Sequence, residues 1–329
     1  MAGRFRDAFK DDFRILAYHR VLESVDPESF RFDLELISAS AENFREQMSL
    51  IKRKFNPIRF DELTDCIDRG RAPPPRSILV TFDDGYDDNY RVAFPILRDL
   101  DMSAMFFVST GHIESGMPYA YDWLVHMVCT TSASDLAIPE IDVAWQLPDS
   151  LDARRGSAAR LLEILKNHSA LVQESVMESL QNQWNMPRVP HADCRPMTWE
   201  QLREMRDGGM ELGSHGVHHR MLAKLPAHLM TEEVIDSKSM LDHNLGGSAQ
   251  VLSYPVGGFN AYDHAVVEAT RSAGFRMACS YVSGTNRLQV DSSYSLRRLH
   301  VERGVDAAWF QGMLELPEIF SYRTNAFTG

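Results

Sequence analysis

Two groups of polar side chains are spaced so that they could do chemistry together. The first is Asp83-Asp84 in the segment TFDDGYDDNY, where two adjacent carboxylates follow an apolar run. Because like charges repel, one of the two carboxylates is expected to be neutralised or paired with a cation. An acidic turn exposed to solvent would have the same sequence, so this group alone is compatible with both interpretations.

The second group is the segment SHGVHH, in which His215 and His219 are four residues apart. One helical turn would place both imidazoles on the same face. Two imidazoles and a carboxylate from another strand would form a three-ligand site for a divalent cation, with positions left open for water and substrate, as in catalytic metal sites. Histidines at this spacing are also common as ordinary surface or core residues. His218 does not share the four-residue spacing of His215 and His219, so we do not expect this spare histidine to be a ligand.

The sequence patterns of the elements that must position these groups predict an α/β fold. Apolar runs typical of buried strands alternate with amphipathic helical patterns, which favours βα units around a parallel barrel. The expected strands are 14–19, 77–82, 104–108, 210–214, 251–254, 275–280 and 296–301, and the expected helices include 41–54, 91–100, 231–245 and 263–273. Both polar groups directly follow expected strands, and barrel strands carry catalytic residues at their C-terminal ends.

The alternation stops between about residues 111 and 195, where the sequence becomes polar and helical. We interpret this stretch as a helical insertion within a single barrel domain that spans residues 1–329. Asp122-Trp123 lies near its start, and the indole could either stack on a sugar ring or pack among the inserted helices.

Composition narrows the class of protein. The chain of 329 residues is 44% hydrophobic and 24% charged, which is typical of a globular protein. Its formal net charge of −12 argues against nucleic acid or an anionic membrane as partner. The four cysteines are far apart, and we find neither an apolar leader core nor a stretch long enough to be a transmembrane segment. These features predict a cytoplasmic protein with reduced thiols.

Four segments resemble the polysaccharide deacetylase family, that is, the chitooligosaccharide-deacetylase homology domain of carbohydrate esterase family four. In chain order they are LVTFDDGYDDNY, MTWEQLREMRDGGMELGSHGVHH, LSYPVGGFN and EATRSAGFRMA. The resemblance covers roughly residues 14–112 and 195–303 and leaves the insertion out. It implies a distorted, incomplete (β/α) barrel and metal-dependent removal of an N-acetyl or other acyl group.

The resemblance implies a role for each residue of the two polar groups. Asp83 would be the general base, and Asp84, His215 and His219 would bind one divalent metal ion. Zinc is the first expectation for two imidazoles and one carboxylate, and cobalt, nickel, manganese or iron would suit the same ligands. The implied substrate is an acetylated amino sugar, an oligosaccharide or a glycan precursor.

The sequence departs from the family pattern around these residues. Tyr254 and Pro255 in the segment SYPVG are expected to line the acyl pocket, but the Arg that often begins this motif is missing. Arg297 and Arg298 are candidates to orient the base in its place. Gly216 stands where the family usually has Ser or Thr after the first histidine, so a hydroxyl that could brace the loop is lost.

The general acid has two candidates, because the usual C-terminal Leu-x-His motif is not cleanly present. His19, at the end of the expected N-terminal strand, resembles the acid of a subgroup that includes exopolysaccharide deacetylases. His300 in LRRLHV is the alternative. Two other functions stay open: a catalytically idle carbohydrate-binding relative, and a hydrolase of a non-sugar amide C–N bond.

Overall fold

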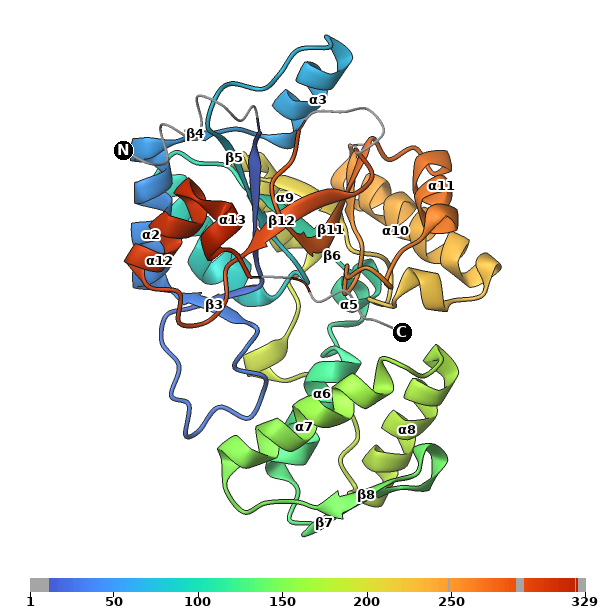
Figure 1. Cartoon of the computed structure of the whole chain (residues 1–329). Helices are drawn as coiled ribbons and strands as arrows, with labels where there is room; N and C mark the ends of the chain where they lie inside the picture. Colours follow the sequence, from blue (N-terminus) through green and yellow to red (C-terminus); the bar gives the residue numbers. More distant parts are fainter. Residues whose placement is uncertain (1–11, 248, 288–292, 323, 325–329) are drawn as a thin grey trace.

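A parallel β-barrel forms the centre of the computed structural model, which describes residues 12–247, 249–287, 293–322 and 324 (Figure 1). The strand order is β1 (Arg14–Tyr18), β12 (Leu296–His300), β11 (Met277–Ser283), β10 (Val251–Ser253), β9 (Glu211–Ser214), β6 (Met105–Val108) and β5 (Ser77–Phe82). The short strand β4 (Asn56–Pro57) pairs with β5 outside this ring. Within the described residues, β1 pairs with both β12 and β5 and so closes a barrel of seven strands. The expected (β/α) barrel is confirmed, and it is incomplete in having seven strands among the described residues where the full (β/α) barrel has eight.

The register of the strands brings their C-terminal ends to one end of the barrel. Tyr18 lies opposite Phe82, and Ala17 lies opposite both Thr81 and His300. The residues that follow β1 and β5 are therefore neighbours, and the N–H of Asp83 donates to the carbonyl of Tyr18 at 2.9 Å. This end of the barrel is where the polar groups of the sequence meet.

Helices cover the outside of the barrel and, at 60–68, its N-terminal end (Figure 1). They are α2 (Ala41–Lys54), α3 (Phe60–Asp68), α4 (Phe94–Asp99) with the preceding π-turn η1 (Asn89–Ala93), α5 (Thr110–Ser115), α9 (Trp199–Asp207), α10 (Ala227–Leu245), α11 (His264–Ser272), α12 (Ala307–Glu315) and α13 (Pro317–Phe320). Two short parallel strands, β2 (Arg20–Leu22) and β3 (Ile37–Ser40), precede α2. Helix α2 has the bounds expected from its apolar spacing, and Ser40 caps its first turn. The sequence analysis did not predict α3, α12 or α13.

Alternation along the strands separates two apolar layers, since successive residues of a strand point to opposite sides. Leu16 and Val80 pack in the large cluster that the outer helices join. Ile15 and Leu79 belong to a smaller cluster with Phe107 and residues of the other strands, which fills the barrel. Residues in phase with Leu79 therefore point into the barrel, including Asp83 just beyond the strand end.

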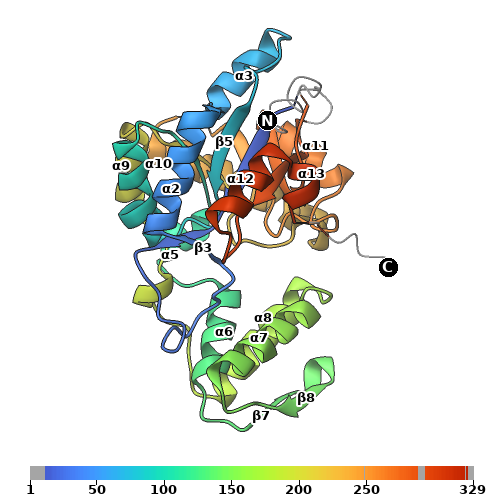
Figure 2. The same ribbon diagram turned by 60° about the vertical axis from the view of Figure 1, so that its left-hand side comes forward.

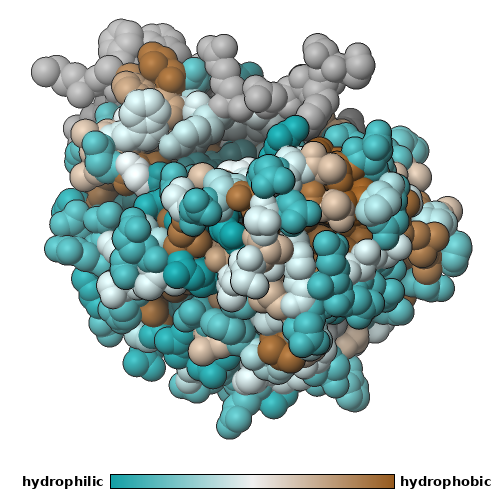
Figure 3. All heavy atoms as spheres, turned by 90° about the horizontal axis from the view of Figure 1, so that it is seen from below, coloured by the Kyte–Doolittle hydropathy of each residue, from teal (hydrophilic) through white to brown (hydrophobic). Residues whose placement is uncertain are grey.

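The part of residues 111–195 that follows α5 forms a lobe beside the C-terminal end of the barrel (Figures 1 and 2). It contains α6 (Ala120–Thr130), β7 (Asp135–Ile138), β8 (Val143–Gln146), α7 (Leu151–Leu165), α8 (Ala170–Gln183) and η3 (Ala192–Cys194). The lobe has its own apolar cluster, in which Trp123 is only 3% exposed and packs as a core residue. The antiparallel pair β7–β8 was not expected in a helical insertion. Seen from the side on which the lobe lies, the surface is mainly hydrophilic with separate apolar patches (Figure 3).

Two expectations concern membranes and the start of the chain. In the described part of the chain, no helix has the length and apolar character that crossing a bilayer requires. The N-terminal segment in which no leader core was found lies largely in residues 1–11, outside the described residues.

Candidate metal and catalytic site

Strand β5 delivers the two adjacent aspartates to the mouth of the barrel. All six residues of the strand are buried, and a sharp turn follows in which Asp84 has φ 75° and Gly85 has φ 76°. A Cβ on Gly85 would lie 2.7 Å from Cγ1 of Val108, so glycine is required there for space as well as for its backbone angle. The turn leaves both carboxylates 2% exposed.

The loop after β9 brings His215 and His219 together, but not as a helical turn. The helical interpretation of this segment is wrong, because Gly216 and His219 both have positive φ, at 74° and 56°, and the residues form an irregular loop. The side chain of Glu233 on α10 stabilises this loop. One carboxylate oxygen of Glu233 accepts the N–H groups of Val217 and His218 at 2.8 and 2.9 Å.

Glu233 supports the candidate site, and the sequence analysis missed it. Its other oxygen lies 2.8 Å from Nδ1 of His218, which explains why this spare histidine points away from the site. A Cβ on Gly216 would come 3.2 Å from the Glu233 carboxylate. The glutamate therefore braces the loop from outside, where the family pattern would have a hydroxyl on the loop itself. Nothing in the sequence marks Glu233 among the other acidic residues of α10.

Asp84, His215 and His219 converge on one point. Oδ1 of Asp84 lies 3.5 Å from Nε2 of His215 and 3.2 Å from Nε2 of His219, and the three atoms all lie within 4.8 Å of one another. Oδ1 of Asp84 is buried without a hydrogen-bond partner. Nδ1 of His215 is 2.8 Å from the carbonyl of Ser253, and donation there leaves the Nε2 lone pair free. These donors fit a divalent cation.

The electrostatics of the three residues also suit a cation. Burial alone would raise the pKa of Asp84, but the adjacent imidazoles of His215 and His219 outweigh it and hold this pKa well below the usual value. Burial would lower the pKa of His215, but the charges of Asp83 and Asp84 raise it. The protein therefore places a concentrated negative charge here, in a setting shielded from water.

Asp83 is held by a buried arginine from strand β12, which is separated from β5 only by β1. Arg298 donates to both Asp83 oxygens at 2.7 Å and also to the hydroxyl of Ser253 at 3.0 Å. Burial raises the pKa of Asp83, but the guanidinium of Arg298 outweighs it, and the net shift is downward. Asp83 is therefore ionised at neutral pH.

Of the two arginine candidates, the structure brings only Arg298 to the base. Arg298 is fully buried and in phase with Leu296, which points into the barrel. Arg297 is exposed, because neighbouring residues of a strand point to opposite sides, and its side chain packs beside Gly284.

The remaining acidic residues of the TFDDGYDDNY segment are buried and paired. Asp87 forms ion pairs with Arg91 and Arg195, and Asp88 forms one with Arg20 at 2.9 Å. These carboxylates are neutralised by arginines and are not part of the candidate metal site.

The two candidate acids lie near the same mouth. His19 directly follows β1 and is partly buried, and its charge helps to lower the pKa of Asp83 and of Asp84 after larger contributions from their closer partners. His300 is 6% exposed and stacks on Tyr281, with 3.7 Å between ring centroids. Burial, followed by the charge of Arg298, lowers the pKa of His300 to about 3. At neutral pH, His300 is therefore a neutral imidazole.

Tyr254 and Pro255 follow β10 and are both buried. The hydroxyl of Tyr254 donates to the carbonyl of Tyr294 at 3.0 Å, and its ring stacks on Tyr262. Pro255 lies beside the histidine loop, 3.6 Å from the position that a Cβ on Gly216 would take. Their contact with an acyl group stays a prediction.

Two tyrosines from the lobe also reach the site, and the sequence analysis missed both. The hydroxyl of Tyr121 donates to Oδ2 of Asp84 at 3.1 Å, and that of Tyr119 donates to the Asp84 carbonyl at 2.5 Å. Both rings lie 5.2 Å from the ring of His219. Only their position near the start of the predicted insertion could have drawn attention to them.

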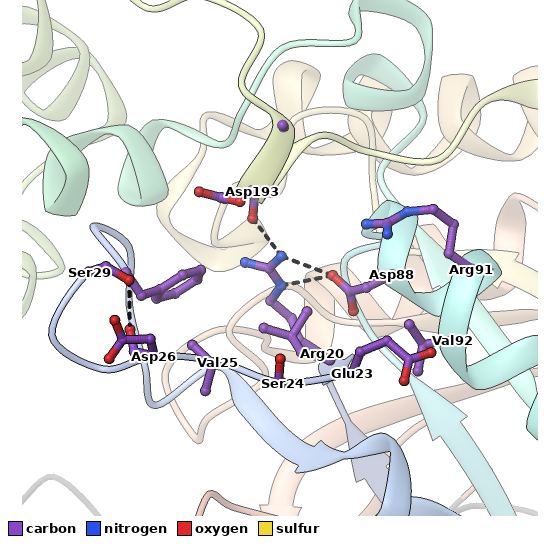
Figure 4. A pocket seen from close by; sticks show the side chains of 13 residues that line it. Arg20, Glu23, Ser24, Val25, Asp26, Ser29, Asp88, Arg91, Val92 and Asp193 are labelled. Carbon is purple, nitrogen blue, oxygen red and sulfur yellow. Dashed lines mark hydrogen bonds and ion pairs between the residues drawn. The ribbon is translucent and has the colours of Figure 1, made fainter.

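A pocket of about 330 Å³ opens beside the site, between the loop after β2 and the turn η1. In Figure 4, the guanidinium of Arg20 lies between the carboxylate of Asp88 and the backbone of Asp193 at the floor of this pocket. Glu23 and Asp26 are exposed at its edge. Its lining does not include Asp83, Asp84 or the two ligand histidines.

Comparisons with known proteins identify the family of the chain. A sequence model of the family described as polysaccharide deacetylase matches residues 70–136 and 142–278, more than half of the chain. The chain belongs to this family. The matched range includes most of residues 111–195, which the sequence analysis had placed outside the resemblance.

Individual relatives are distant. YxkH of Bacillus subtilis (strain 168), named as a candidate polysaccharide deacetylase, is 22% identical over 257 residues, which is 77% of this chain and 62% of YxkH. The Streptococcus pyogenes deacetylase PplD, solved in complex with acetate, has a TM-score of 0.61 and 18% identity, with 94% of this chain and 98% of PplD covered. IcaB from Ammonifex degensii has a TM-score of 0.58 and 19% identity, with 93% and 96% covered. The two solved structures share the fold.

Proposed function

We propose that the protein is a metal-dependent hydrolase that removes an N-acetyl or other acyl group from an amino sugar within an oligosaccharide, a polysaccharide or a glycan precursor. The observation that carries this proposal is the convergence of Asp84, His215 and His219 on one point beside an ionised Asp83. Membership of the polysaccharide deacetylase family supports the substrate class.

Asp84, His215 and His219 are the residues that would hold the cation. When bound, a divalent cation supplies a Lewis acid that lowers the pKa of water and polarises an acyl carbonyl. Zinc suits two imidazoles and one carboxylate, and cobalt, nickel, manganese or iron would suit them as well.

Asp83 would act as the general base. It is ionised at neutral pH, and the two hydrogen bonds from Arg298 fix the plane of its carboxylate. In the reaction it would take a proton from the water that attacks the acyl carbon. Transfer of that proton neutralises the Asp83 carboxylate as the negative charge moves to the acyl oxygen, so the net charge of the site does not change.

His19 would act as the general acid. As the C–N bond breaks, the leaving nitrogen needs a proton, and an imidazolium can donate one. His19 is partly exposed at the mouth of the barrel, whereas the low pKa of buried His300 leaves that residue without a proton to give at neutral pH. The products are acetate, or the corresponding acid, and a free amine.

The decisive experiment measures acetate release from acetylated amino-sugar oligomers of defined length. Release that stops with a chelator and returns when zinc or cobalt is added back is the expected result. Asp83→Asn should lower the rate by roughly 10²–10⁴-fold, as expected for removal of a general base. A folded protein that binds the oligomers but releases no acetate would instead support the alternative of a carbohydrate-binding relative.

A further inference from the structure

The lobe next to the barrel forms part of the metal site itself. Of the two oxygens of Asp84, Oδ1 faces the two histidines and Oδ2 accepts a hydrogen bond from Tyr121 at 3.1 Å. Tyr121 belongs to α6, the first helix that is packed into the core of the lobe. The hydroxyl therefore links an element of the lobe to a ligand on the barrel.

We propose that Tyr121 is a positioning residue for the metal site, and that Tyr86 and Asp122 hold its hydroxyl in place. Tyr121 would fix which oxygen of Asp84 is offered to the cation. The inference rests on the proposed function, because it assumes that Asp84, His215 and His219 bind a metal.

The geometry at Asp84 explains why such a residue is needed. A carboxylate rotates through a broad range about its last side-chain bond, so an unrestrained aspartate can present either oxygen or both. Here one oxygen is hydrogen-bonded and the other is buried with no partner. A phenol is neutral and holds the carboxylate without an opposing charge, so the negative charge of Asp84 stays available for a cation.

A second layer holds Tyr121. The hydroxyl of Tyr86 lies 3.2 Å from that of Tyr121 and 2.7 Å from Oδ2 of Asp122. Tyr86 and Asp122 are both fully buried, and the guanidinium of Arg20 lies over the Tyr86 ring at 4.5 Å. The four oxygens from Asp122 to Asp84 therefore form a continuous chain of contacts.

The hydrogen-bond directions show how the two hydroxyls are held. Each hydroxyl carries a single proton: Tyr121 donates its proton to Oδ2 of Asp84, and Tyr86 donates its proton to Oδ2 of Asp122. Asp122 therefore fixes the hydroxyl of Tyr86, whose oxygen lies 3.2 Å from that of Tyr121.

The rings of the same segment also position a second ligand. Tyr119 and Tyr121 stack on each other at 5.0 Å, and both pack against the ring of His219. His219 has a positive φ and is the most exposed of the three candidate ligands. The lobe thus supports two of the three ligands.

The test measures zinc affinity by competition with a chelating indicator, on the full chain, for the unaltered protein and for Tyr121→Phe. Loss of a residue that orients a ligand typically lowers metal affinity by roughly 10–100-fold, and this is the expected result. The visible spectrum of the cobalt-loaded protein should also change, because a freed carboxylate alters the coordination geometry. A residue that only supported the fold would leave this spectrum unchanged.

Two further variants serve as controls. Tyr90→Phe removes a hydroxyl that bonds to Glu204 on the outer surface, and it should bind zinc like the unaltered protein. Asp122→Asn keeps an acceptor oxygen for the Tyr86 hydroxyl and should keep most of the affinity. If Tyr121→Phe does not fold, Tyr86→Phe decides the matter, since it removes the second hydroxyl and leaves Tyr121 in place.

The outcomes separate the inference from the function on which it rests. If the unaltered protein binds zinc and Tyr121→Phe matches Tyr90→Phe in affinity and cobalt spectrum, the positioning role is wrong and the proposed function stands. If Tyr121→Phe does not fold, unchanged zinc affinity in Tyr86→Phe likewise means that the positioning role is wrong and that the proposed function stands. If the unaltered protein binds no divalent metal, the proposed function itself fails.

Discussion

Asp83 and Asp84 are adjacent, equally buried and both ionised, but different parts of the molecule hold them. Asp83 is held inside the barrel by the guanidinium of Arg298, which comes from strand β12. Asp84 is held at the boundary with the lobe by the hydroxyls of Tyr119 and Tyr121. The first interaction pairs opposite charges, and the second uses neutral donors.

This difference fits two separate tasks. A base next to an arginine stays ionised at neutral pH and can take a proton, since the guanidinium offsets the cost of burying the charge. A metal ligand must keep its charge for the cation, so a neutral hydroxyl is the better partner. The barrel alone can form the first arrangement, whereas the second depends on residues from the lobe.

The largest expected effect tests Asp84 as a metal ligand. Asp84→Ala should abolish zinc binding and lower kcat/KM by about 10³-fold or more, because several kcal/mol of transition-state stabilisation are lost. Isothermal titration with zinc and acetate-release kinetics measure the two effects. Asp83→Asn is the matched control and should keep zinc affinity while losing activity. Zinc affinity that falls equally in both variants would contradict the division of tasks.

The next effect tests the ion pair between Asp83 and Arg298 inside the barrel. Arg298→Met leaves the Asp83 carboxylate buried without its partner, which should lower the free energy of unfolding by about 3–5 kcal/mol at pH 7. Urea unfolding measures this loss. The matched control is the exposed neighbour in Arg297→Met, expected within about 0.5 kcal/mol of the unaltered protein.

The same pair predicts a pH dependence. Because the folded pKa of Asp83 lies below its ordinary value of 3.8, the pairing stabilises the fold above that value, and its contribution is lost as the pH falls through the folded pKa. The difference in stability between Arg298→Met and the unaltered protein should therefore shrink in acid. A difference that stays constant below pH 4 would contradict the ionic character of the pair.

A smaller effect tests which histidine acts with Asp83 as the general acid. His19→Gln should lower kcat on an N-acetyl substrate by about 10²–10³-fold, as expected for loss of a general acid. His300→Gln should change it by less than about 10-fold, because buried His300 is neutral at neutral pH. An aryl acetate, whose leaving group needs no proton, should be hydrolysed almost normally by His19→Gln. The reverse order of the two histidine variants would assign the acid to His300.

The smallest effect tests the protonation of Asp122, a buried residue of the lobe. Burial raises the pKa of Asp122 from 3.8 to about 7, so between these values the folded protein binds a proton that the unfolded chain has released. Stability should therefore fall as the pH rises through this range, by at most about 1.4 kcal/mol per pH unit from this group. Asp122→Asn should remove that part of the slope, which thermal unfolding at pH 5 and pH 7 would measure. An identical slope would mean that Asp122 is ionised in the fold.

Much of the fold could be predicted because its signals are local. Apolar runs marked the barrel strands, and the spacing of Phe44, Met48 and Ile51 marked α2. The β7–β8 pair, α3, α12 and α13 were missed, as their patterns are short. The helical turn assigned to the histidine loop was wrong because two residues in left-handed backbone angles, including the non-glycine His219, override the spacing.

By itself, the sequence determined the family, the barrel and four chemistry-bearing residues: Asp83, Asp84, His215 and His219. Their types and their places after apolar runs are local properties of the chain. The tertiary structure alone decided which groups surround them. Strand direction turned Arg298 inward and Arg297 outward, and packing of the lobe brought Tyr121 to Asp84 across 37 positions of sequence. Such pairings depend on distance in space, which no spacing along a single chain encodes.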